Sequence, residues 1–219
     1  MKGIQADGAV SKIIASGLDV KTWLLAVPDV DSVRPGMCPC CGRAGSPTGR
    51  PLGIIGHGLR ERQQRGPLLA GGVPVVVTVR VRRYACGCGA ILMVVPREML
   101  RGRLYMASAV AWAMALFGVE HLAQSKVRQR TSPLAVVGAA ATTRWATLRR
   151  WVHAVRAGRL LSKVRPAPAT FTKRQVAERA AMTAAAMTPP SLATLEISSR
   201  AFLEVRAPRD GHRPRRASP

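Results

Sequence analysis

Residues 37–42 read Met-Cys-Pro-Cys-Cys-Gly and residues 86–89 read Cys-Gly-Cys-Gly, and these two segments hold every cysteine of the chain. A structural metal site needs four ligands in tetrahedral geometry, and thiolates suit it when each pair comes from one tight turn. A glycine follows Cys41 and Cys88, which allows a left-handed conformation that aims backbone N–H groups at the sulfurs. We therefore expect one structural zinc ion, held by Cys38, Cys41, Cys86 and Cys88.

Other ligand sets remain open at this point. The second pair has one residue between its cysteines, where two are usual, so the role of Cys88 is in question. Cys40 is a fifth thiol that can replace Cys41 or stay free, and His57 is a candidate substitute ligand. Unrelated cysteines or a redox dithiol are the alternatives to a metal site. Four protein ligands would leave no open coordination position, so the expected site is structural rather than catalytic.

Strand-forming sequence separates the two cysteine segments. Residues 73–84 alternate strongly, which predicts a strand. One face carries Val75, Val77, Val79 and Val81, and the other carries Val76, Thr78, Arg80 and Arg82. Residues 90–95 predict a second strand, ended by Pro96, and residues 53–62 a third. Two cysteine turns brought together by a small antiparallel sheet are the arrangement of a zinc ribbon.

The sequence after the last strand favours helices. Residues 104–117 are apolar on all sides, which is typical of a central helix, and Gly118 is a plausible C-cap. Residues 120–130 predict a second helix, ended before the dipeptide Ser132-Pro133.

Residues 143–157 form the clearest helical pattern. Trp145, Leu148, Val152 and Val155 recur at helical spacing and make one apolar stripe. We expect Thr142 or Thr143 to cap the N-terminus, and Gly158 to follow the C-terminus in a left-handed conformation.

These segments predict an α+β fold in four regions. Residues 1–36 are a partly helical lead-in with an amphipathic stretch at 10–25, and residues 37–97 are the zinc ribbon. Residues 98–163 are a helical, helix-turn-helix-like domain. Residues 164–219 hold an Ala-rich helix at 172–187 and a disordered basic tail at 206–219.

The charge of the chain is strongly positive. Lys and Arg number 34 against 11 Asp and Glu, a formal net charge of +23. A GC-rich genome explains the preference for Arg over Lys, but not the excess of bases over acids. Duplex DNA is the expected partner, because phosphate contacts supply most non-specific affinity.

The longest apolar run, 107–119, is shorter than the roughly 20 residues of a membrane span, and no signal peptide opens the chain, so we expect a cytoplasmic protein.

Several motifs together resemble one protein family. They are C-P-x-C-G at 38–42, Gly-His-Gly at 56–58 with Arg60 and Arg62, Arg-Arg-Tyr-x-Cys at 82–86, Val-Pro-Arg at 95–97 and Trp-x-x-Leu-Arg-Arg-Trp at 145–151. Over residues 37 to about 160 the chain resembles a bacterial family of uncharacterised zinc-ribbon proteins, transposase-like and associated with insertion sequences. The resemblance implies that the four cysteines are the zinc ligands. It also implies that the helix 145–156 recognises DNA, as in the DNA-binding head of related transposases.

Two groups of basic residues are the candidate DNA contacts. A helix that docks in the major groove needs an apolar face on its partner helices and a basic or polar face toward DNA. On the helix and just before it, the candidates are Arg144, Arg149, Arg150, His153 and Arg156. On the strand 73–84, they are Arg80, Arg82 and Arg83. The alternative to DNA contact is that the basic face of this helix is only exposed to solvent.

No catalytic motif is found in the sequence. Common transposases use three carboxylates that hold two metal ions, but past residue 120 the only acidic residues are Glu178, Glu196, Glu204 and Asp210. We expect a non-catalytic protein. A zinc-ribbon protein–protein adaptor in a nucleoprotein complex is the second hypothesis, and a redox-sensing thiol switch is the third. The sequence leaves the oligomeric state open, a homo-oligomer included.

Overall fold

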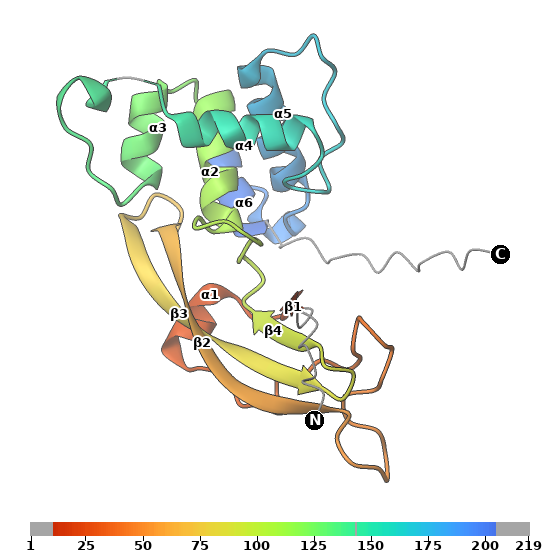
Figure 1. The fold of residues 1–219 in the computed structure, drawn as a ribbon. Coiled ribbons are helices and arrows are strands. Elements are labelled where there is room, and N and C mark those ends of the chain that lie inside the picture. The colour runs from red at the N-terminus through yellow and green to blue at the C-terminus, as the bar shows by residue number, and fades with distance from the viewer. Residues whose placement is uncertain (1–10, 143, 205–219) are drawn as a thin grey trace, which may run out of the picture. The chain divides into compact units, whose positions relative to one another are not determined.

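The structure, a computed structural model, describes residues 11–142 and 144–204. Within these residues the chain forms a four-stranded sheet and six α-helices (Figure 1), so the predicted α+β fold class is confirmed. The described residues divide into two units. Residues 11–62 and 79–97 form the first, and residues 63–78 and 98–204 form the second.

The sheet has the order β1-β4-β3-β2. The three predicted strands are present as β2 (Ile54–Pro67), β3 (Pro74–Cys86) and β4 (Ile91–Val95). β4 runs antiparallel to β3 and parallel to β1 (Ser11–Ala15). The strand β1 was not expected, because its residues lie inside a stretch predicted only as amphipathic.

The core of the first unit lies against β3. Val79 and Val81 are fully buried, as the alternating pattern predicts for this strand. Tyr84 is also fully buried, although the pattern places it on the opposite face. The helix α1 (Val20–Leu25) lies before the first cysteines, and its Trp23 is also buried. The indole Nε1 of Trp23 donates a hydrogen bond of 2.8 Å to the carbonyl of Arg80. The lead-in residues are therefore anchored to the same strand that carries Cys86.

The second unit is organised around the helix α2 (Ala107–Gly118), in which every residue is buried. Its apolar surface contacts four helices: α3 (Gln124–Thr131), α4 (Ala146–Arg156), α5 (Lys173–Ala186) and α6 (Ile197–Glu204). Figure 1 shows α2 among these helices. The prediction of a central helix is therefore confirmed, whereas α6 was not predicted.

Gly118 does not cap α2 in the predicted way. It is the last residue of the helix, and Val119 is the C-cap residue. A Cβ atom on Gly118 would lie 2.2 Å from the backbone nitrogen of Glu178. The absence of a side chain therefore allows α2 and α5 to pack closely, which is a different role from ending a helix.

The sequence predicted the C-terminal end of α4 correctly, but not its N-terminal cap. The N-cap residue is Trp145, so the prediction of a Thr142 or Thr143 cap is wrong, and Thr143 itself lies outside the described residues. The N–H of Trp145 donates to Oε1 of Gln124, 3.0 Å away. At the other end Gly158 has φ +66°, as predicted.

The remaining described elements are the Ala-rich helix and two 3-10 helices. The predicted Ala-rich helix is α5, and Thr172 and Gln175 form a capping box at its start. The 3-10 helices η1 (Gly138–Ala141) and η2 (Pro190–Leu192) lie in the connections. None of the described helices has the length and apolarity to cross a membrane. The basic tail predicted at 206–219 lies outside the described residues.

Candidate metal centre

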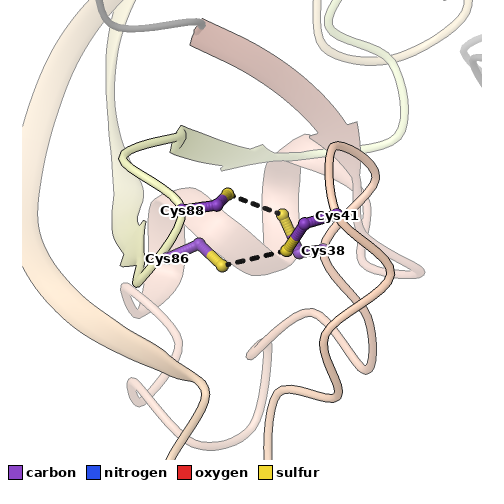
Figure 2. Close-up of side chains that lie close together, drawn as sticks. All are labelled: Cys38, Cys41, Cys86 and Cys88. Carbon is purple, nitrogen blue, oxygen red and sulfur yellow. Dashed lines mark hydrogen bonds between the residues drawn. The ribbon is translucent and has the colours of Figure 1, made fainter.

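The first cysteine turn closes between Cys38 and Arg43. The N–H of Cys38 donates to the carbonyl of Arg43 at 2.8 Å, and the N–H of Gly42 donates to the carbonyl of Cys38 at 2.9 Å. Gly42 has φ +72°, a conformation that favours glycine. The prediction for this glycine is confirmed, and the turn places Cys38 and Cys41 on one side of the loop (Figure 2).

The second cysteine turn joins β3 to β4. The N–H of Cys86 donates to the carbonyl of Ala90 at 3.0 Å, and the N–H of Gly89 donates to the carbonyl of Cys86 at 2.9 Å. Gly89 has φ +84°, again as predicted. A Cys-x-Cys segment therefore forms a turn equivalent to the first, although it is one residue shorter than usual.

The four sulfurs lie together. All four lie within 4.8 Å of one another, and Figure 2 shows the two pairs facing each other. The sulfurs of Cys38 and Cys88 are 3.8 Å apart, and those of Cys41 and Cys86 are 3.7 Å apart. A disulfide requires about 2.05 Å, and none of the described cysteines forms one. The group can therefore hold a metal ion.

The electrostatics of the cluster distinguish its two buried thiols. Burial raises the pKa of Cys38, but the N–H groups of Cys40 and Cys41 donate to its sulfur and lower the pKa to about 7. The N–H of Cys88 favours the thiolate of Cys86, yet burial and the neighbouring sulfurs raise its pKa to about 12. Four thiols this close titrate as a group, because each thiolate opposes the ionisation of the next. A cation among them would remove that opposition.

Cys40 and His57 lie outside this group. Cys40 is exposed, and partial desolvation of its thiol together with the charge of Cys38 raises its pKa. His57 is exposed on β2. Of the ligand sets that the sequence left open, the structure brings together Cys38, Cys41, Cys86 and Cys88.

Sequence reasoning did not identify Arg43 as part of this site. Its Nη1 lies 2.9 Å from the position that a Cβ atom on Gly87 would take. Gly87 separates the two ligands of the second turn, so the Arg43 guanidinium lies beside that turn. It provides a positive charge next to a cluster that becomes negative as its thiols ionise. The two residues are too far apart in sequence for a local motif to connect them.

The predicted DNA contacts of the helical unit lie on one face of α4. Leu148, Val152 and Val155 are buried, which confirms the apolar stripe. The exposed basic residues on the helix or just before it are Arg144, Arg149, Arg150 and His153. Arg156 is different, because it is half-buried and its guanidinium donates to the carbonyl of Phe171.

The predicted contacts on β3 differ in exposure. Arg80 is exposed, whereas Arg82 and Arg83 are half-buried. Nε of Arg82 donates to the carbonyl of Pro28 at 2.7 Å, so this side chain also holds the lead-in segment. Among the three, Arg80 is the side chain most available to a partner.

The connection before α4 is longer than a helix-turn-helix would have. Residues 132–145 join α3 to α4, whereas a helix-turn-helix uses a turn of about three or four residues. Tyr105, Trp145 and Trp151 form an edge-to-face cluster at the end of this connection, because Trp145 is its last residue. The ring centroids of Tyr105 and Trp151 are 5.0 Å apart, and those of the two tryptophans are 5.1 Å apart.

Comparisons with known proteins do not add to this picture. No protein family, curated protein or solved structure matches the chain. Function must therefore be argued from the cysteine group and from the distribution of charge.

Proposed function

We propose that the protein binds duplex DNA, that its first unit is stabilised by one structural zinc ion, and that it is transposase-like or derived from a mobile element. It would act without a catalytic domain of its own. The observation that carries this proposal is the exposed basic face of α4, whose opposite face packs in the core.

Zinc is the metal that the cysteine group favours. Four thiolates at about 2.3 Å from a tetrahedral ion lie about 3.8 Å apart, and the two closest sulfur pairs are 3.7 and 3.8 Å apart. Backbone N–H donors to Cys38 and the guanidinium of Arg43 would stabilise the negative charge of the site. Zinc would join the loop of Cys38 to the β3–β4 turn, and four protein ligands would leave it no catalytic position.

The charge around α4 supports DNA as the partner. The sequence from position 121 to 177 contains no acidic residue, so the exposed Arg149, Arg150 and His153 have no carboxylate neighbour on their own helix. A helix with one buried apolar face and one exposed basic face can present arginines to phosphates or base edges. Self-repulsion in such a surface is relieved when a polyanion binds.

The salt dependence of duplex binding tests the proposal. The affinity of the zinc-loaded full chain should fall steeply with salt, with a logarithmic slope of about −0.9 for each phosphate contacted. The double variant Arg149→Gln/Arg150→Gln should reduce that slope by about 2. Lys21→Gln removes one exposed charge from α1 and is the matched control.

Two outcomes would reject DNA binding by α4. One is the absence of duplex binding at low salt. The other is an equal salt slope in the double variant and in the wild type. If the chain binds a partner protein and does not bind DNA, the adaptor hypothesis is favoured instead.

A further inference from the structure

The second unit contains a cavity of about 360 Å³. Its wall is formed by the end of β2, the segment before α2, α3 with the connection that follows it, and the first half of α4. Two backbone hydrogen bonds hold the first two elements together: Arg65 N–H donates to the carbonyl of Leu104 at 2.7 Å, and Met106 N–H donates to the carbonyl of Arg65 at 3.3 Å. The cavity therefore belongs to one packed unit.

The polar side of this cavity is basic. Four arginines line it, and no Asp or Glu is among the described lining residues: the arginines are Arg65, Arg103, Arg128 and Arg150. Nε of Arg65 is buried and has no hydrogen-bond partner among the described residues. A buried donor without a partner costs about 1–3 kcal/mol, so an acceptor supplied by a ligand would stabilise it. Phosphate is the anion that arginine forks bind best.

The start of α4 adds to the positive potential. Thr147, in the first turn of the helix, lines the cavity. Among the described residues no side chain caps this helix, and its first turn contains no acidic residue. The first N–H groups of an α-helix have no partner within the helix, and they favour a bound anion.

The other side of the cavity is apolar. Leu104, Leu134 and Val136 line it and are exposed, and the buried Trp145 and Trp151 also line it. Exposed aliphatic side chains beside a cluster of arginines fit a ligand that is anionic at one end and flat and weakly polar at the other. An inorganic anion alone would leave the apolar side in water.

We propose that this cavity binds one nucleotide unit, with its phosphate at the arginines and its nucleoside against the aliphatic side chains. A cavity of about 360 Å³ lies within the usual range for small ligands, roughly 300–1,000 Å³. A free mononucleotide and one residue of single-stranded DNA share this chemistry. The inference goes beyond duplex binding, because a paired base cannot enter the cavity.

Tryptophan fluorescence of the zinc-loaded full chain tests the proposal, because Trp145 and Trp151 line the cavity. The probes are dAMP, deoxyadenosine, inorganic phosphate and a dT oligonucleotide. We expect dAMP or the oligonucleotide to bind at least about tenfold more tightly than deoxyadenosine and phosphate, because only they engage both sides. Tighter binding of dAMP identifies a free nucleotide as the ligand, and tighter binding of the oligonucleotide identifies a single strand.

Substitutions of the lining residues test whether the ligand binds in the cavity. Arg65→Gln and Arg103→Gln should each weaken it about tenfold or more, and Arg159→Gln, an exposed residue outside the lining, should not. Circular dichroism checks the fold, and Arg103→Gln suffices if Arg65→Gln does not fold. Absence of binding, equal binding of phosphate alone, or unchanged binding in the folded variants overturns the proposal. Arg150 lines the cavity and also belongs to the double variant, so duplex binding is measured here with the single variant Arg149→Gln, and either function can fail without the other.

Discussion

Replacing Gly118 with alanine places a methyl group where the backbone of α5 lies. The new Cβ would be 2.2 Å from the nitrogen and 2.6 Å from the Cα of Glu178, and 2.7 Å from the carbonyl carbon of Ala177. These obstacles are backbone atoms, so no side-chain rotation relieves them, and α2 and α5 must move apart by about 1 Å. Overpacking of this kind costs about 1–3 kcal/mol.

The greater helix propensity of alanine offsets about 1 kcal/mol of that cost. The contact is severe and α2 touches four helices, so we expect a net loss of about 2 kcal/mol in the free energy of unfolding. Urea unfolding followed by far-ultraviolet circular dichroism measures it. Gly17→Ala is the control, because a Cβ there would have no atom within 4 Å, and it should change stability by less than about 1 kcal/mol.

A second substitution separates packing from capping at the same position. Asparagine is tolerated where a helix ends in a left-handed conformation, but it is larger than alanine. If Gly118 is required for close packing, Gly118→Asn should destabilise the protein at least as much as Gly118→Ala. Equal or greater stability of Gly118→Ala relative to the wild type would refute the packing argument.

Two further predictions concern helix termini. Thr172→Ala removes the capping box that Thr172 shares with Gln175, and it should lower the free energy of unfolding by about 1 kcal/mol, measured by urea titration. An unchanged midpoint of unfolding would show that α5 does not need this cap. At Asp19 the N–H of Thr22 holds the carboxyl pKa below its usual value of 3.8, so its stabilisation is complete above that value and is lost as the pH falls through the lower, folded pKa. The stability difference between wild type and Asp19→Asn should therefore shrink in acid, and a constant difference between pH 2 and 6 would contradict this.

Hydrophobic periodicity predicted the strands and helices that bury one face and expose the other. The alternation around Val79 gave β3, and the stripe of Leu148 and Val152 gave α4, because burial on one face leaves a regular sequence trace. The strand β1 left no such trace, since five residues around Ile13 become a strand only by pairing with β4. Local sequence does not encode a partner that lies far along the chain.

The cysteine group was predictable for a related reason. Each pair lies in one short turn with a glycine behind it, so the local sequence already specifies how its sulfurs point. Arg43 and the arginines of the cavity could not be predicted in the same way. Arg65 on β2 and Arg150 on α4, for example, line the same cavity although they lie far apart in the sequence.

Metal content measured on the purified chain tests the zinc site most directly. We expect one zinc per chain in the wild type and in Cys40→Ser, because the Cys40 sulfur lies outside the group. Cys88→Ser should lose the metal, because it removes one of four ligands without touching the first turn. Zinc retained in Cys88→Ser, or lost in Cys40→Ser, would contradict the site formed by Cys38, Cys41, Cys86 and Cys88.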